Sequence, residues 1–192
     1  MFAQRCLTQL FIITGPEIEF STFIAAMYSP PSIFEYPFDD RLLELRGILS
    51  AEEIRTPDNI DSKFRDPMRY VIKRGLTTLT TIGCLNGFDS YVRRYFAIGS
   101  RDSVEVAVHP YGIDRDESSY LSEKLNFGPF SRLGDSGSII VDPLGKFVAL
   151  LTSATGQRTT SDITFGSPMY WLWEVIEAQF PGAKLIFEDD DT

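Results

Sequence analysis

From residue 42 onward the chain alternates short apolar segments with clusters of turn residues, and this pattern restricts the possible folds most strongly. Turn signals such as Asn86-Gly87 and Asp142-Pro143-Leu144-Gly145 separate segments that are too short for most helices. Short strands with frequent turns are typical of a β-barrel or a β-sandwich. The predicted strands cover residues 43–48, 70–73, 77–85, 91–96, 104–108, 138–141, 147–152 and 163–165.

One helix is predicted near the C-terminal end. Ser167 suits the N-cap position, Pro168 suits the first helical position, and Pro181-Gly182 ends the pattern. The apolar stripe that recurs at three- and four-residue spacing consists of Met169, Leu172, Trp173, Ile176 and Phe180. We therefore expect an all-β barrel closed by a C-terminal α-helix that docks this stripe on the barrel.

The length of 192 residues suits one domain, or one complete lobe of a two-lobed fold plus remnants of another. Residues 1–40 are irregular, punctuated by prolines and rich in aromatic residues; we interpret them as a remnant of a first lobe or a linker between lobes, which could lie over a sheet. The predicted barrel with its helix spans 41–187, and 188–192 form an acidic tail that is most simply a solvated end.

Charge and composition exclude several classes of function. The net charge of −9 argues against partners such as nucleic acids and anionic membranes, which reward basic surfaces. One histidine and two widely separated cysteines, Cys6 and Cys84, make a metal site improbable, and no cofactor is expected. Two free thiols and a poor signal-peptide pattern favour an intracellular protein.

The segment Gly134-Asp135-Ser136-Gly137-Ser138 is the motif that can carry chemistry. Gly134 lets backbone approach a substrate carbonyl, and the N–H groups of Gly134 and Ser136 can together stabilise an oxyanion. Ser136 would supply a nucleophilic hydroxyl, and Asp135 would turn inward and hold the loop. The same residues are also good turn formers, so a plain turn between strands is the alternative.

The wider sequence resembles the second barrel of chymotrypsin-like serine proteases, and more closely a group of uncharacterised fungal trypsin-like proteins. The pieces that carry the resemblance are Tyr36-Pro37 with Arg41-Leu42-Leu43, Val71-Ile72-Lys73-Arg74-Gly75 with Thr77-Thr78, Thr81-Ile82-Gly83, Phe130-Ser131, Ile139-Ile140-Val141-Asp142, Leu150-Leu151-Thr152, Asp162-Ile163-Thr164-Phe165, Ser167-Pro168 and Phe180-Pro181-Gly182-Ala183. The resemblance implies that Ser136 is the nucleophile and that Gly134 and Ser136 are the oxyanion-hole donors.

The resemblance also implies where a peptide or protein substrate would bind. Residues 151–154, with Thr152, Ser153 and Ala154, match the strand along which the substrate backbone pairs. Residues 164–167, with Thr164 and Gly166, match the back wall of the specificity pocket. The last two implied positions, near the base of that pocket, are Phe130 and Ser131. A plain core strand is the alternative for residues 151–154.

A serine needs a base, and in that family the histidine and aspartate precede the serine and come from the first barrel. This chain is expected to begin too late to hold that barrel, and its one histidine is His109. His109 ends a predicted strand and precedes Pro110, so we interpret it as a surface or turn residue rather than a base.

The sequence therefore predicts a trypsin-like serine endopeptidase homologue that is catalytically incompetent as it stands. Three alternatives remain: a pseudoprotease module that binds peptides, a serine hydrolase whose histidine comes from His109, from an upstream segment or from another chain, and a structural β domain. A partner is also expected to cover barrel surface that a missing first barrel would expose.

Overall fold

The computed structural model describes residues 11–12, 42–43, 45–57, 59–60, 67–110, 129–155 and 163–185. The predicted segment 1–40 lies outside these residues apart from β1 (Phe11–Ile12), which pairs with β2 (Leu42–Leu43), and the tail 188–192 lies outside them entirely. In the described part of the chain, no helix is long and apolar enough to span a bilayer.

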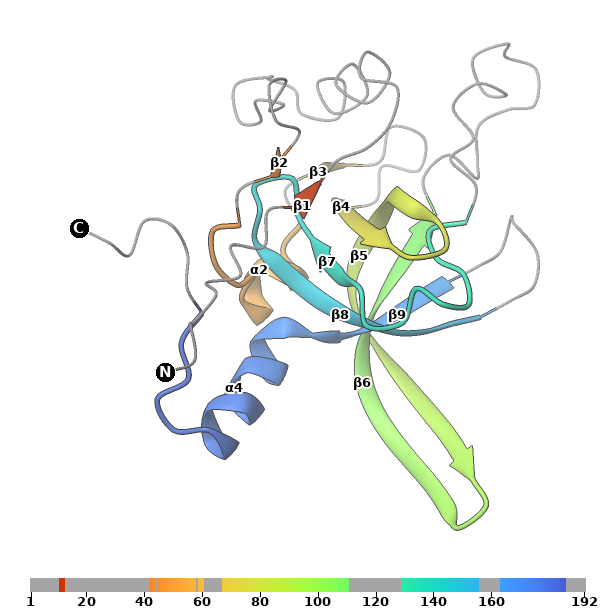
Figure 1. Ribbon diagram of the computed structural model, residues 1–192. Helices are drawn as coiled ribbons and strands as arrows, with labels where there is room; N and C mark the ends of the chain where they lie inside the picture. Colours follow the sequence, from red (N-terminus) through yellow and green to blue (C-terminus); the bar gives the residue numbers. More distant parts are fainter. Residues whose placement is uncertain are drawn as a thin grey trace, which may run out of the picture.

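Antiparallel strands close into a barrel. The sheet order is β3-β4-β5-β6-β9-β8-β7, and β7 also pairs with β4, which closes the ring (Figure 1). The strands are β3 (Asn59–Ile60), β4 (Pro67–Gly75), β5 (Leu79–Phe96), β6 (Gly99–Pro110), β7 (Ile139–Val141), β8 (Phe147–Thr155) and β9 (Ile163–Pro168). The helix α4 (Met169–Gln179) follows directly. The prediction of an all-β barrel with a C-terminal helix is confirmed.

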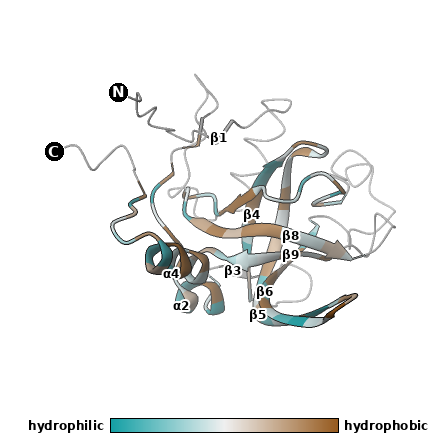
Figure 2. Ribbon diagram, turned by 60° about the horizontal axis from the view of Figure 1, so that its bottom comes forward, coloured by the Kyte–Doolittle hydropathy of each residue, from teal (hydrophilic) through white to brown (hydrophobic). Residues whose placement is uncertain are grey.

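Two hydrophobic clusters form on opposite faces of β4, because consecutive strand residues point to opposite sides of a sheet. Val71 belongs to the cluster that also contains Phe130 and Ile140, and Ile72 belongs to the cluster against which α4 packs. Figure 2 shows hydrophobic residues along the barrel strands, β8 among them. Both clusters therefore depend on β4, which also carries part of the candidate site.

The prediction of a turn at Asn86-Gly87 is wrong. The strands predicted at 77–85 and 91–96 are one strand, β5, with a register shift between Leu85 and Asp89 against β6. Gly87 has φ +76°, and the Phe88 N–H donates to the Asn86 side chain at 3.1 Å. These two residues form a bulge that bends the strand instead of reversing it, since β6 continues to pair on both sides.

The strand predicted at 43–48 is also wrong. The described residues from 45 to 50 are irregular except for one bridge between Ile48 and Phe147. They lead into a short helix, α2 (Ala51–Arg55), which Ser50 and Glu53 close with a capping box. Glu53 also forms an ion pair with Lys146 at 2.5 Å, which ties this helix to the start of β8.

The predicted start of the C-terminal helix is displaced by one residue. Pro168, not Ser167, occupies the N-cap position, because β9 continues through Pro168. Met169 is buried, and Leu172 and Trp173 pack against the barrel as expected. Phe180 is 67% exposed at the end of the helix, so the docked stripe stops before it.

Closure of the barrel can be tested at Ile72, which is fully buried and pairs with Ile82 on one side and Val141 on the other. Ile72→Ala is expected to lower the free energy of unfolding by about 2–5 kcal/mol, from lost burial and the cavity left behind. Leu76→Ala, at an exposed position in the following turn, should change it by less than about 0.5 kcal/mol. Urea denaturation measures both, and equal effects would contradict this closure.

Candidate functional site

The segment 134–138 forms a compact loop immediately before β7. Gly134 has φ +101° and Gly137 has φ +87°, a region that favours glycine. The Asp135 N–H donates to the Arg132 carbonyl and the Ser138 N–H to the Asp135 carbonyl, each at 3.0 Å. Gly137 N–H reaches Leu151 of β8 at 2.8 Å. The loop is thus tied both to itself and to the barrel.

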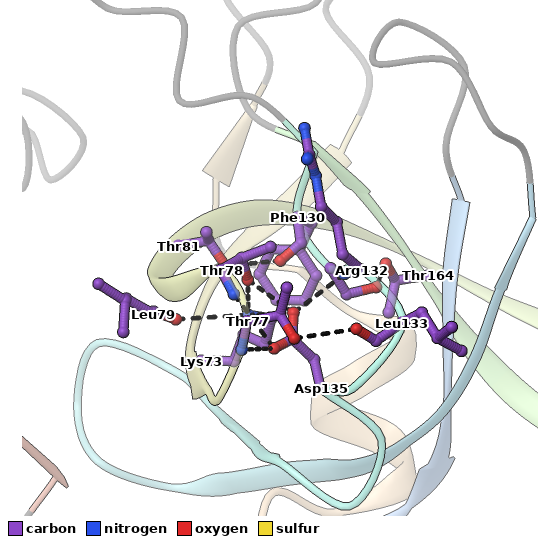
Figure 3. A network of polar contacts seen from close by, with 11 residues as sticks. Lys73, Thr77, Thr78, Leu79, Thr81, Phe130, Arg132, Leu133, Asp135 and Thr164 are labelled. Carbon is purple, nitrogen blue, oxygen red and sulfur yellow. Dashed lines mark hydrogen bonds and ion pairs between the residues drawn. The ribbon is translucent and has the colours of Figure 1, made fainter.

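Asp135 is turned inward and fully buried (Figure 3). Its carboxylate accepts four hydrogen bonds: from Thr77 N–H at 2.7 Å, Thr78 N–H at 3.2 Å, Thr78 Oγ1 at 2.7 Å and Arg132 N–H at 2.9 Å. Two of the donor residues, Thr77 and Thr78, belong to the turn between β4 and β5, and the third, Arg132, lies just before the loop. Asp135 therefore fastens the loop to a neighbouring pair of strands.

The counter-charge of Asp135 is Lys73 of β4. The Lys73 Nζ lies 3.4 Å from Asp135 Oδ2, and both side chains have 0% exposure. Lys73 also donates to Thr78 Oγ1 at 2.5 Å and to the Leu79 carbonyl at 3.4 Å. Its ammonium lies 5.6 Å from the centre of the Phe130 ring, a cation–π distance. Every charge in this cluster is paired, as burial requires.

The pKa values of the pair follow from this environment. Burial opposes the ionised form of Asp135, but hydrogen bonds from Thr78, Arg132 and Thr77, together with the Lys73 charge, lower its pKa to about 2. Burial lowers the pKa of Lys73, and Asp135 opposes that shift. Because the pKa of Asp135 is depressed, its contribution to stability is present above about pH 4 and is lost as the pH falls towards 2.

The chain reaches this geometry through Gly75 and the turn that follows it. A Cβ at Gly75 would collide with the Asp135 carboxylate, so β4 must end in glycine for the aspartate to enter. Leu79 has φ +56°, which is uncommon for leucine and turns its carbonyl towards Lys73. Backbone strain of this kind persists where the surroundings fix it.

The two backbone donors implied for an oxyanion hole are free to act. Within the described residues, the N–H groups of Gly134 and Ser136 make no hydrogen bond, and neither does the Ser136 hydroxyl, which is exposed. A Cβ at residue 134 would lie 2.5 Å from Thr77 Oγ1, so glycine is required there. The loop thus presents a serine and two unsatisfied donors to solvent.

The residues implied for a specificity pocket pack against each other. Phe130, Ser131, Thr164 and Gly166 are all buried. Ser131 Oγ and Thr164 Oγ1 form a hydrogen bond of 2.6 Å, and the Phe130 carbonyl accepts from Thr81 Oγ1 at 2.6 Å. These contacts hold the segment before the loop in place, but they leave these four positions in contact with protein rather than solvent. A specificity pocket here stays a prediction.

The residues implied for substrate pairing lie on β8, whose continuation has one open edge. Leu151 is hydrogen-bonded to Gly137 and Ser138 on the loop side. Beyond it, β8 pairs with β9 through Ser153, Ala154 and Thr155, and the described residues provide no strand on its other edge. A register shift falls at Thr152, whose hydroxyl donates to Glu105 at 2.5 Å.

His109 lies within β6, where it is half-buried and paired with Cys84 of β5. His109 thus lies near the end of a strand, as predicted, but inside the strand and half-buried rather than in a turn. Because Ser136 bonds to no described residue, the two side chains do not form a nucleophile–base pair. No group of three or more potential metal-ligating side chains occurs in the described ranges.

Sequence reasoning missed Lys73 and Glu105. Lys73 follows Val71-Ile72 inside a buried strand, and a lone lysine in such a run signals a buried cation. Glu105 is 1% exposed and accepts bonds from Arg94, Ser103 and Thr152. Its partners are distant in sequence, so only the fold reveals them.

The structure is similar to the crystal structure of Cellulomonas bogoriensis chymotrypsin, with a TM-score of 0.45 and 14% identity, over 81% of this chain and 62% of that one. It is also similar to an inactive form of the Mycobacterium tuberculosis protein Rv3671c that carries a serine-to-alanine substitution, with a TM-score of 0.34 and 11% identity, over 65% of this chain and 55% of that one. The chain therefore spans less than two thirds of either structure. No family model and no curated protein matches the sequence.

The ion pair beneath the loop can be tested with Lys73→Met, which keeps the bulk and removes the charge. Leaving Asp135 buried without a cation is expected to lower the free energy of unfolding at neutral pH by about 3–5 kcal/mol. The difference in the free energy of unfolding between the wild type and the variant should shrink as the pH falls from about 4 towards 2, because the wild-type chain loses the stabilisation by ionised Asp135 in this range. Urea denaturation across this pH range measures both effects.

Lys146→Met is the matched control, since it removes a partly exposed lysine from an ion pair with Glu53. It should change the free energy of unfolding by about 0–1 kcal/mol. If Lys73→Met lowers the free energy of unfolding by no more than Lys146→Met does, the buried ion pair does not hold the loop.

Proposed function

We propose that this chain is the nucleophile-bearing barrel of a trypsin-like serine peptidase, with Ser136 as nucleophile. The observation that carries the proposal is the loop itself: Ser136 is exposed, the N–H groups of Gly134 and Ser136 have no hydrogen-bond partner among the described residues, and Asp135 is anchored on Lys73. Preorganised donors aimed at developing negative charge are a large source of rate acceleration in acyl transfer. We also propose that the chain is related to the fungal trypsin-like proteins that its sequence resembles.

The chemistry this loop can perform without a base is limited. Ser136 Oγ would attack a carbonyl carbon, and the oxyanion would accept bonds from Gly134 and Ser136. The hydroxyl proton must leave at the same time, and the sole histidine of the sequence is held in β6. Without a triad base, serine peptidases keep only about 10³–10⁴-fold acceleration over water. We therefore propose that this chain by itself binds at the loop but turns over substrate negligibly.

The rate at which a fluorophosphonate probe labels Ser136 distinguishes a catalytically active serine from one that lacks a base. With no base at Ser136, labelling is expected at a rate about 10³-fold or more below that of a competent serine peptidase, and none in Ser136→Ala. Mass spectrometry of the intact protein measures both rates. Fast labelling that is lost in His109→Ala would instead establish an active hydrolase with His109 as base, and equal labelling in Ser136→Ala would reject Ser136 as the nucleophile.

A second candidate function is peptide binding without turnover, which the open edge of β8 favours. An extended peptide can add to a free sheet edge through main-chain hydrogen bonds. The edge begins where β8 passes the loop at Leu151 and continues through Thr155. A peptide on it would run beside Ser136, so binding and the nucleophile loop belong to one site.

The edge can be tested by titrating an extended peptide library and then measuring the best ligand against two variants. Ala154→Pro removes an N–H and places a ring on the strand, so affinity should fall about tenfold or more. Ser136→Ala leaves the backbone intact and should bind the peptide as the wild type does. Isothermal titration calorimetry gives the affinities. An unchanged affinity in Ala154→Pro, or no saturable binding of any peptide, would remove this function.

A further inference from the structure

A guanidinium group of the β5–β6 hairpin contacts the strand that we propose to bind peptides. Arg94 belongs to the outer half of this hairpin, which extends away from the barrel in Figure 1. Its Nη2 nitrogen donates to Glu105 Oε1 at 2.8 Å and to Ser153 Oγ at 3.1 Å. Ser153 lies on β8, so the Arg94 side chain reaches β8 although β9 separates β6 from β8 in the sheet.

Glu105 holds this guanidinium group in place. Glu105 is 1% exposed, and its carboxylate also accepts hydrogen bonds from Ser103 Oγ at 2.7 Å and from Thr152 Oγ1 at 2.5 Å. Thr152 directly precedes Ser153 on β8, so one carboxylate connects the hairpin to the strand at this point. A side chain that is already ordered loses less conformational entropy when it binds a ligand.

Arg94 retains hydrogen-bonding capacity beyond these two contacts. Both use Nη2, so the Nε and Nη1 groups have no partner among the described residues. The Arg94 side chain is 39% exposed, which leaves it accessible to a ligand. The free N–H groups of an accessible, ordered guanidinium group are suited to a carboxylate.

The face of the hairpin that carries Arg94 also has an unbalanced positive charge. Arg101 of β6 lies directly opposite Arg94 and makes no ion pair with the described residues. Opposed residues of an antiparallel pair project to the same face, and Glu105 shares it because it lies four residues from Arg101. Two guanidinium groups thus share one carboxylate on the described part of this face. Like charges in opposed positions are unfavourable, and a bound anion would relieve their repulsion.

Only alternate residues of a peptide on β8 can reach Arg94. A peptide residue that pairs opposite Ser153 projects its side chain to the face on which Ser153 Oγ contacts Arg94. The two neighbouring peptide residues project to the other face. A carboxylate opposite Ser153 is therefore placed beside the guanidinium group.

We propose that Arg94 is a specificity-determining residue, which selects peptides that carry aspartate or glutamate opposite Ser153. The peptide carboxylate accepts hydrogen bonds from the free N–H groups of Arg94, Arg101 adds attraction, and Glu105 keeps the guanidinium group in position. Hydrogen bonds between two charged groups are stronger than those to a neutral amide, so glutamate is preferred over glutamine. This specificity rests on the proposed binding of extended peptides to β8.

A pair of blocked hexapeptides of alanine and threonine, with one central glutamate or one central glutamine, tests the proposal. The wild-type chain is expected to bind the glutamate peptide about tenfold more tightly than the glutamine peptide, from charge-assisted hydrogen bonds. The net charge of −9 gives the chain no general attraction for acidic peptides, so the preference must come from local cations. Chemical-shift titration by NMR measures both affinities.

Two arginine variants assign the preference to one side chain. Arg94→Gln should bind both peptides equally. Arg93→Gln is the matched control: it makes the same charge change at the adjacent residue, which projects to the other face and pairs with Asp102 at 2.6 and 2.8 Å. Arg93→Gln should keep the tenfold preference.

A double variant guards against misfolding. Arg94→Gln leaves the buried Glu105 carboxylate without its cation, which can destabilise the fold. Arg94→Gln/Glu105→Gln removes both charges and should also bind the two peptides equally, and its NMR spectrum shows whether the fold is retained.

The outcomes separate this specificity from peptide binding itself. Equal binding of the two peptides by the wild type, or a glutamate preference that persists in both Arg94 variants, would overturn the role of Arg94 and leave peptide binding on β8 intact. If the wild type binds neither peptide and no member of the peptide library, the proposed peptide binding fails and this specificity fails with it.

Discussion

The buried ion pair between Lys73 and Asp135 is the interaction on which the candidate site depends. A carboxylate with no exposure is costly unless it is paired and hydrogen-bonded, and this one accepts four hydrogen bonds beside a buried ammonium. The pair joins the loop before β7 to the turn between β4 and β5. As a result, the position of Ser136 is set by a residue on a different strand pair.

The barrel supplies the rigid frame that this pair requires. β4 pairs with both β5 and β7, so Lys73 sits at the seam where the ring closes. The loop is held on its other side by β8, through the bonds of Leu151 to Gly137 and Ser138. A loop fastened on both sides in this way has a fixed backbone, as the proposed oxyanion site requires.

The sequence predicted the barrel, the helix and the loop because each has a local signal. Alternating segments and turn clusters identified most strands, and the spacing of Met169, Leu172 and Trp173 identified α4. The turn predicted at Asn86-Gly87 was wrong, because the residues that favour a hairpin turn also favour a bulge. Only the pairing of β5 with β6 decides between the two. Lys73 was missed because its partner lies 62 residues further along the chain and the pair exists only once the ring is closed.

We propose that the loop forms an oxyanion site around Ser136 even without a neighbouring base. A crystal structure with a peptidyl boronic acid tests it directly, because the boron forms a tetrahedral adduct on a serine hydroxyl. We expect an adduct on Ser136 Oγ whose boronate oxygen lies about 2.7–3.1 Å from both the Gly134 and the Ser136 nitrogen atoms. An adduct whose oxygen contacts neither nitrogen, or a loop that leaves Ser136 unmodified at saturating inhibitor, would contradict it.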